Sequence, residues 1–273
     1  MLIIGESLNG TIPSVGNAIA TRDAAFVTDL ALLQVECGAA MIDVNAGGVR
    51  DGDECANLAW MVEVVQDAVQ VPLVLDSSNP EVLRAALAVY RGEQLILSSI
   101  STEEAGIEAL LPLAVERQCG LVALCMSVEG IPPDAEGRAA LAARLVERAL
   151  AAGLPAENLY IDPLAMSLAT GHVAGIITMD TMRLVRERHP GVKTLLAASN
   201  VGFGMPQRRL LNRTFVAMLT ALGLDAVLVD VRDAEVMAAL IAARAIAGDD
   251  DLCRGYVKAY RRGKLGPLAE AKQ

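Results

Sequence analysis

Polar side chains recur along the chain at the points where short apolar runs end. Asp76 closes the run PLVLD, Asp162 lies in LYIDP, and Asn200 closes TLLAASN. An ionised carboxylate accepts hydrogen bonds and can accept two parallel ones from a flat donor edge. Side chains of this kind predict a site for a neutral heterocycle that carries N–H donors.

The pattern extends to nearly every apolar run of the sequence. The polar residues at these positions are Glu6, Asn9, Asp43, Asn45, Asp76, Ser77, Asn79, Ser98, Ser99, Ser127, Asp162, Asn200 and Asp230. For Asn79, as for Asp233, capping of a following helix is the better interpretation. Several others lie inside the apolar runs, where capping does not explain them. A pterin has the amino-amidine edge that such a ring of acceptors would bind, so we expect a pterin ligand.

A phosphate ligand remains as an alternative from the residues alone. The segment NVGFGMPQRR contains Gly202 and Gly204 followed by Arg208 and Arg209, which could cradle a sugar phosphate. A Gly-x-Gly pair alone is a weak signal, and we therefore favour the heterocycle.

The apolar runs themselves indicate parallel strands that alternate with helices. Ala-rich stretches of helical spacing separate them, with Asp23, Asn79 and Asp233 as expected helix starts. Strand then helix, repeated eight times, predicts a single (β/α)8 TIM barrel. The expected strands are 2–6, 41–45, 72–76, 95–100, 121–126, 159–163, 194–200 and 226–230.

The barrel is expected to occupy 1–248, with 249–273 as a helical or flexible C-terminal extension of the same domain. The alternative, a doubly wound sheet, would favour a GxGxxG turn after its first strand, and residues 5–10 read GESLNG. Polar groups that follow barrel strands meet at one face, where TIM barrels carry their sites.

Composition narrows the classes of partner. The chain has 273 residues, 53% of them hydrophobic, and a net charge of −10, which argues against nucleic acid. No run approaches the roughly 20 apolar residues of a membrane span, and no targeting segment is evident, so we expect a cytoplasmic protein. His172 and His189 lack ligand spacing, and the cysteines show no CxxC pair, so we expect neither a metal site nor disulfides.

Several motifs together resemble one known family, the methyltetrahydrofolate:corrinoid protein methyltransferases. This family shares a pterin-binding barrel with the folate domain of cobalamin-dependent methionine synthase and with dihydropteroate synthase. The likeness covers essentially the whole chain. It rests on MLIIGESLNG, IDVNAG, LDSSNP, LYIDPL and SNVGFGMPQRRLLNRTFVAM.

The resemblance implies an activity and a set of partners. Tetrahydrofolate or its 5-methyl form would be the substrate, and a corrinoid (cobalamin) on a partner protein would exchange the methyl group at the C-terminal face of the barrel. The active form in this family is commonly a homodimer. Neither the residues nor the resemblance chooses the direction of transfer.

The resemblance also implies roles for individual residues. Asp76 and Asp162 would grip the pterin ring from opposite sides of the barrel mouth. Asn200 would swing onto the bound folate, and Arg208 would contact the ligand from the following loop. Asp43 and Asn45 match a family motif, and for these two both a ligand role and a structural role stay open.

The sequence departs from the family pattern at the fourth strand. Where one member of the family has an Asn that hydrogen-bonds the methyl-bearing nitrogen N5, LILSSIS places Ser98 or Ser99, and Phe203 stands where that member has a polar residue. We expect Ser98 and Asn200 to be the catalytic residues, stabilising charge at N5. The alternatives are a dihydropteroate-synthase-like enzyme, although the Arg-x-His and Ser-Arg-Lys motifs of that enzyme are missing, and a non-catalytic folate-binding barrel.

Overall fold

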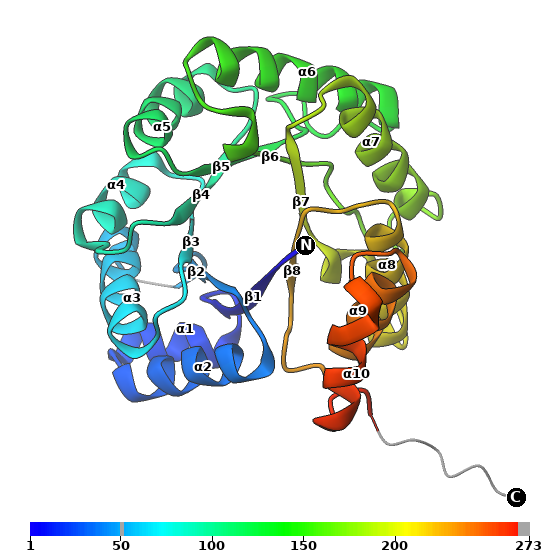
Figure 1. Cartoon of the computed structure of the whole chain (residues 1–273). Helices are drawn as coiled ribbons and strands as arrows, with labels where there is room; N and C mark the ends of the chain where they lie inside the picture. Colours follow the sequence, from blue (N-terminus) through cyan, green and yellow to red (C-terminus); the bar gives the residue numbers. More distant parts are fainter. Residues whose placement is uncertain (50–51, 267–273) are drawn as a thin grey trace, which may run out of the picture.

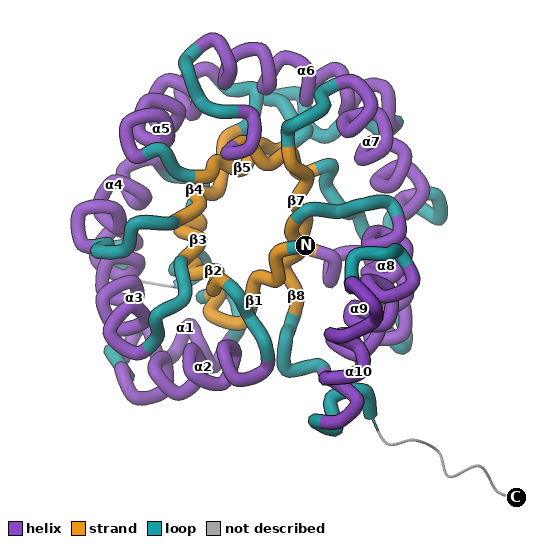
Figure 2. The backbone as a smooth tube through the Cα atoms, viewed as in Figure 1, coloured by secondary structure: helices purple, strands orange, loops and turns teal. Residues whose placement is uncertain are grey.

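The chain forms a closed barrel of parallel strands surrounded by helices (Figures 1 and 2). The computed structural model describes residues 1–49 and 52–266. The strands pair in sequence order and β8 pairs with β1, which closes the sheet. The predicted (β/α)8 TIM barrel is thereby confirmed. The strands are β1 (Leu2–Asn9), β2 (Met41–Asn45), β3 (Leu73–Asp76), β4 (Leu95–Ile100), β5 (Gly120–Leu124), β6 (Leu159–Asp162), β7 (Lys193–Ala197) and β8 (Ala226–Val229).

Helices follow the strands and cover the outside of the barrel (Figure 2). Several begin where a side-chain oxygen accepts a backbone N–H of the first turn: Asp23 caps α2, Asn79 caps α4 and Asp233 caps α9. These three starts were predicted. The helices are α1 (Pro13–Thr21), α2 (Ala24–Cys37), α3 (Glu54–Ala68), α4 (Pro80–Val89), α5 (Glu104–Arg117), α6 (Ala135–Ala151), α7 (Ala174–Arg188), α8 (Arg208–Ala221), α9 (Ala234–Ile246) and α10 (Arg254–Arg261), with 3-10 turns η1 (Ala156–Asn158), η2 (Ala198–Gly202) and η3 (Asp251–Cys253).

Two strands end three residues away from the predicted position. β1 continues past Glu6 to Asn9, and β7 stops at Ala197. The last three residues of the predicted strand TLLAASN belong to η2, in which the Phe203 N–H donates to the Asn200 carbonyl at 3.1 Å. Within the predicted extension at 249–273, η3 and α10 occupy 251–261, and 267–273 lie outside the described residues.

Two apolar layers hold the barrel together. The larger one fills the space between the strands and the helices. The smaller one lies inside the barrel, because every second side chain of a strand points to the same face. Each strand contributes one residue to this inner layer: Ile4, Met41, Val74, Ile96, Val122, Tyr160, Leu195 and Ala226. The packed layer fills the interior of the barrel, so a ligand can bind only at one of its two ends.

Candidate functional site

The candidate site consists of one inward-facing residue from each strand, two residues beyond the residue that the strand contributes to the inner apolar layer. Since side chains alternate along a strand, this position on each strand faces the barrel axis at the C-terminal end. The residues there are Glu6, Asp43, Asp76, Ser98, Leu124, Asp162, Ala197 and Leu228. The ring is therefore acidic and polar over β1–β4 and β6, and apolar over β5, β7 and β8. A flat ring with polar edges and apolar faces matches this division.

Asp76 is held by the neighbouring strand. Asn45 pairs in register with Asp76 and donates its amide Nδ2 to Asp76 Oδ2 at 2.6 Å. The Gly47 N–H donates to Asn45 Oδ1 at 2.7 Å, which fixes the orientation of that amide. Burial raises the pKa of Asp76, and the side chains of Asn45 and Ser98 counteract this. Asn45 thus orients the carboxylate of Asp76. This contact is a structural role, one of the two roles that the sequence left open for Asn45.

Asp162 lies on the other side of the ring, at the end of β6. Its Oδ1 accepts the Leu164 N–H at 2.7 Å. Burial raises the pKa of Asp162 to about 7, while that N–H and the charge of Arg138 act in the opposite direction. The carboxyl is therefore balanced between its two protonation states at neutral pH. A ligand that donates hydrogen bonds to it favours the ionised form.

Asp43 is the most buried carboxyl of the ring, with 2% of its surface exposed. Burial and the charges of Asp76 and Glu6 raise its pKa well above the ordinary value. Its Oδ1 is buried and has no hydrogen-bond partner among the described residues. Asp43 is thus a buried member of the ring whose surroundings disfavour the ionised form.

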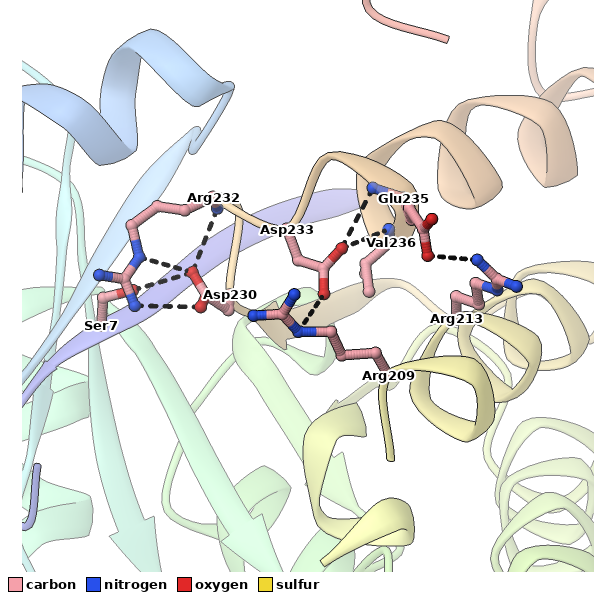
Figure 3. Close-up of polar contacts among 8 residues, drawn as sticks. All are labelled: Ser7, Arg209, Arg213, Asp230, Arg232, Asp233, Glu235 and Val236. Atoms are coloured by element: carbon pink, nitrogen blue, oxygen red, sulfur yellow. Dashed lines mark hydrogen bonds and ion pairs between the residues drawn. The ribbon is translucent and has the colours of Figure 1, made fainter. Parts of the chain in front are cut away.

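Two further carboxylates at the mouth are engaged by the protein itself. Ser199 Oγ donates to Glu6 Oε2 at 3.1 Å, which ties η2 to β1. The Arg232 guanidinium donates to both carboxylate oxygens of Asp230, at 2.8 and 3.0 Å, and Ser7 Oγ adds a bond at 3.3 Å (Figure 3). These bonds lower the pKa of Asp230 despite its partial burial. The negative charge of Asp230 is consequently balanced by Arg232.

The predicted catalytic residues come from opposite sides of the barrel. Ser98 pairs in register with Asp76 at the end of β4, which favours Ser98 over Ser99 as the inward hydroxyl. Asn200 lies in η2 with its side chain exposed, and it makes no side-chain hydrogen bond within residues 1–49 and 52–266. Arg208 begins α8; its Nη2 donates to the Ser199 carbonyl at 3.3 Å.

Arg208 and Arg209, on which the alternative of a phosphate ligand rested, both contact other side chains. Arg209 forms an ion pair with Asp233 at 3.5 Å (Figure 3). The Arg208 guanidinium carbon lies 5.9 Å from the centre of the Phe203 ring. With Arg209 paired, this face offers a phosphate less positive charge than the sequence suggested.

One buried arginine near the site escaped the sequence analysis. Arg138, on the first turn of α6, is 3% exposed and donates to the backbone carbonyls of Pro132, Pro163 and Leu164. No local signal distinguishes it, because an arginine on an Ala-rich helix normally lies on the solvent face.

Cys119 and Cys125 are buried thiols. Burial raises the pKa of Cys119 to about 11 and that of Cys125 further, so both are neutral thiols, in keeping with their predicted structural role. The described part of the chain contains no group of three or more His, Cys, Asp or Glu side chains placed to hold a metal ion. It also has no helix long and apolar enough to cross a membrane.

Comparison with known proteins points to one class of site. The sequence profile of the family described as pterin binding enzyme matches residues 5–230. A methylcorrinoid:tetrahydrofolate methyltransferase of Eubacterium limosum is 37% identical over 270 residues, covering 98% of this chain and 99% of that protein. The methionine synthase of Mycobacterium tuberculosis is 29% identical over 243 residues, covering 84% of this chain and 20% of that protein.

Solved structures share the fold at lower identity. The dihydropteroate synthase of Yersinia pestis superposes with a TM-score of 0.62 at 19% identity, covering 90% of this chain and 93% of that one. The dihydropteroate synthase of Thermus thermophilus, in complex with 6HMPPP, gives 0.63 at 21% identity, covering 92% and 93%.

Proposed function

Because the chain belongs to the pterin-binding enzyme family, we propose that it is a methyltransferase that moves a methyl group between N5 of tetrahydrofolate and the cobalt of a corrinoid on a partner protein. The observation that carries the proposal is the pair Asp76 and Asp162, two half-buried carboxyl groups from β3 and β6 at one level of the barrel mouth. The relative from Eubacterium limosum, similar over its full length, is named for this reaction.

The carboxylates recognise the pterin through its donor edge. Asp76 retains acceptor capacity beyond the bond from Asn45, and Asp162 retains it beyond the bond from Leu164. Burial disfavours the ionised form of both groups, and N–H donors from the pterin restore it. The apolar positions Leu124, Ala197 and Leu228 leave room for the ring faces without competing hydrogen bonds.

The chemistry at N5 requires a proton. In transfer from folate the bond between N5 and the methyl carbon breaks, N5 keeps the electron pair, and N5 takes up a proton because an amide-like anion leaves poorly. The corrinoid's cobalt supplies the electron pair of the new bond and accepts the methyl group, changing from Co(I) to Co(III), or returns it in the reverse direction. Ser98 and Asn200 stabilise the charge at N5 by hydrogen bonding, a contribution of a few kcal/mol.

The remaining residues support this site. Asn45 orients Asp76, Arg208 contacts the ligand from the start of α8, and Asp43 contributes a buried carboxyl to the ring. The direction named for the Eubacterium limosum relative, methylcorrinoid to tetrahydrofolate, is the one we favour here. The corrinoid protein docks over the C-terminal face, where Asn200 and Phe203 are exposed. A homodimer and a cytoplasmic location stay predictions.

Methyl transfer between methyltetrahydrofolate and free reduced cobalamin, followed by absorbance, tests the proposal. We expect transfer by the wild-type protein, and we expect Asp76→Asn to reach the same rate only at a higher folate concentration. Tetrahydrofolate binding without transfer in either direction would contradict the enzyme and favour a non-catalytic binding barrel. Condensation of p-aminobenzoate with a pterin pyrophosphate would instead identify a dihydropteroate-synthase-like enzyme.

A further inference from the structure

The loop that follows Asp162 has an unusual backbone conformation. Leu164 adopts a left-handed φ of 62°, which is uncommon for a residue with a branched side chain and persists only where surrounding contacts enforce it. Its N–H is the group that donates to Asp162 Oδ1 at 2.7 Å. The conformation of Leu164 therefore decides whether this bond to the site carboxylate forms.

Arg138 and Thr178 hold the other side of that residue. Arg138 Nη1 donates to the Leu164 carbonyl at 2.7 Å and to the Pro163 carbonyl at 2.9 Å, and Thr178 Oγ1 donates to the Leu164 carbonyl at 3.1 Å. Arg138 Nε donates to the Pro132 carbonyl at 3.0 Å, which joins the loop before α6 to the same group. The guanidinium thus clamps two loops together at the barrel mouth.

The partners of Arg138 are carbonyls, so its charge is not cancelled by a carboxylate in direct contact. Among the described residues, the charged groups that act on Asp162 are Arg138 from α6 and Asp76 from β3. Cys125, which follows β5, faces Asp162 as a neutral thiol, and Asp134, the N-cap of α6, acts on Arg138. Arg138 is consequently the positive group that offsets Asp76 at this carboxyl.

We propose that Arg138 is a positioning residue for pterin binding, which fixes Leu164 in the left-handed conformation and supplies the positive charge that favours the ionised form of Asp162. This inference rests on the proposed function, because Asp162 must accept hydrogen bonds from a pterin. Arg138 itself touches no substrate: it acts through the backbone of Leu164 and through its charge.

The test is the pH dependence of tetrahydrofolate binding, measured by titration between about pH 6 and about pH 9 for the wild type and Arg138→Met. In the wild type, affinity should fall as the pH drops through about 7, because a protonated Asp162 loses acceptor capacity. In Arg138→Met the midpoint of this loss should move upward by roughly one pH unit or more. Affinity at neutral pH should then fall about fivefold or more and recover at high pH.

Two further variants separate the charge from the clamp. Arg138→Lys keeps the charge without the forked donors, so its midpoint should stay near that of the wild type. Leu164→Gly combined with Arg138→Met restores easy access to the left-handed conformation and protects the fold, yet the upward shift should persist. In an Asp162→Asn background, Arg138→Met should not change the pH dependence further.

The inference would be overturned if folded Arg138→Met had the same midpoint as the wild type. If Arg138→Met does not fold, the double variant with Leu164→Gly takes its place in this comparison. The proposed function would survive that result. Absence of tetrahydrofolate binding by the wild type at every pH would instead overturn the proposed function.

Discussion

Replacing Asp162 by Asn should stabilise the folded protein at neutral and alkaline pH while weakening folate binding. The pKa of Asp162 is about 7 in the folded chain against an ordinary value of 3.8, so the folded state binds this proton more tightly than the unfolded state. Stability from this group is fully present below pH 3.8 and is lost as the pH rises through about 7. Asn has the same shape, carries no charge, and keeps an oxygen for the Leu164 N–H.

The size of this stability difference follows from the interval between the folded and the ordinary pKa of Asp162. It spans roughly three pH units, and each unit corresponds to about 1.4 kcal/mol, so the ionised carboxyl costs the folded state about 4 kcal/mol above pH 7. Asp162→Asn should therefore match the wild type near pH 4 and exceed its free energy of unfolding by up to about 4 kcal/mol near pH 8.

Urea unfolding followed by circular dichroism, repeated across this pH range, measures the difference. Asp249→Asn removes a carboxylate from an exposed position and serves as the control for the loss of one negative charge. A difference between Asp162→Asn and the wild type that stays constant from about pH 4 to about pH 8 would refute the reasoning. So would tetrahydrofolate affinity unchanged by Asp162→Asn, because the destabilising carboxylate would then have no ligand to bind.

Three further changes test other parts of the site. Asp76→Asn should weaken tetrahydrofolate binding by about 1–3 kcal/mol with the fold intact, measured by titration, because an amide places a donor against a donor. Ser98→Ala should lower the single-turnover rate of methyl transfer about ten- to a thousandfold with little loss of folate affinity. If Ser98→Ala has no effect and Asn200→Ala is slow, the amide of Asn200 supplies the hydrogen bond to N5. If neither variant has an effect, solvent protonates N5. Cys125→Ala should fold and retain turnover in the same assay, and its loss in a folded protein would reveal a thiol role.

The sequence alone determined the architecture and the polar residues at which the strands end. The alternation of apolar runs with Ala-rich helical stretches is local, and so are the caps at Asp23, Asn79 and Asp233, so both could be read without distant contacts. Asp76 and Asp162 stand out for the same reason, since a carboxylate at the end of an apolar strand is conspicuous in any sequence.

Only the tertiary structure decided which partners and which degree of burial each polar residue has. The bond from Asn45 to Asp76 joins neighbouring strands, and the clamp of Arg138 on Leu164 joins α6 to the loop after β6. These contacts depend on the register of strands in a closed barrel, which brings together residues far apart in the chain and sets the burial that shifts each pKa. A sequence pattern fixes which face a strand residue occupies, whereas hydrogen-bond partners and local charge follow from which strands and loops become neighbours.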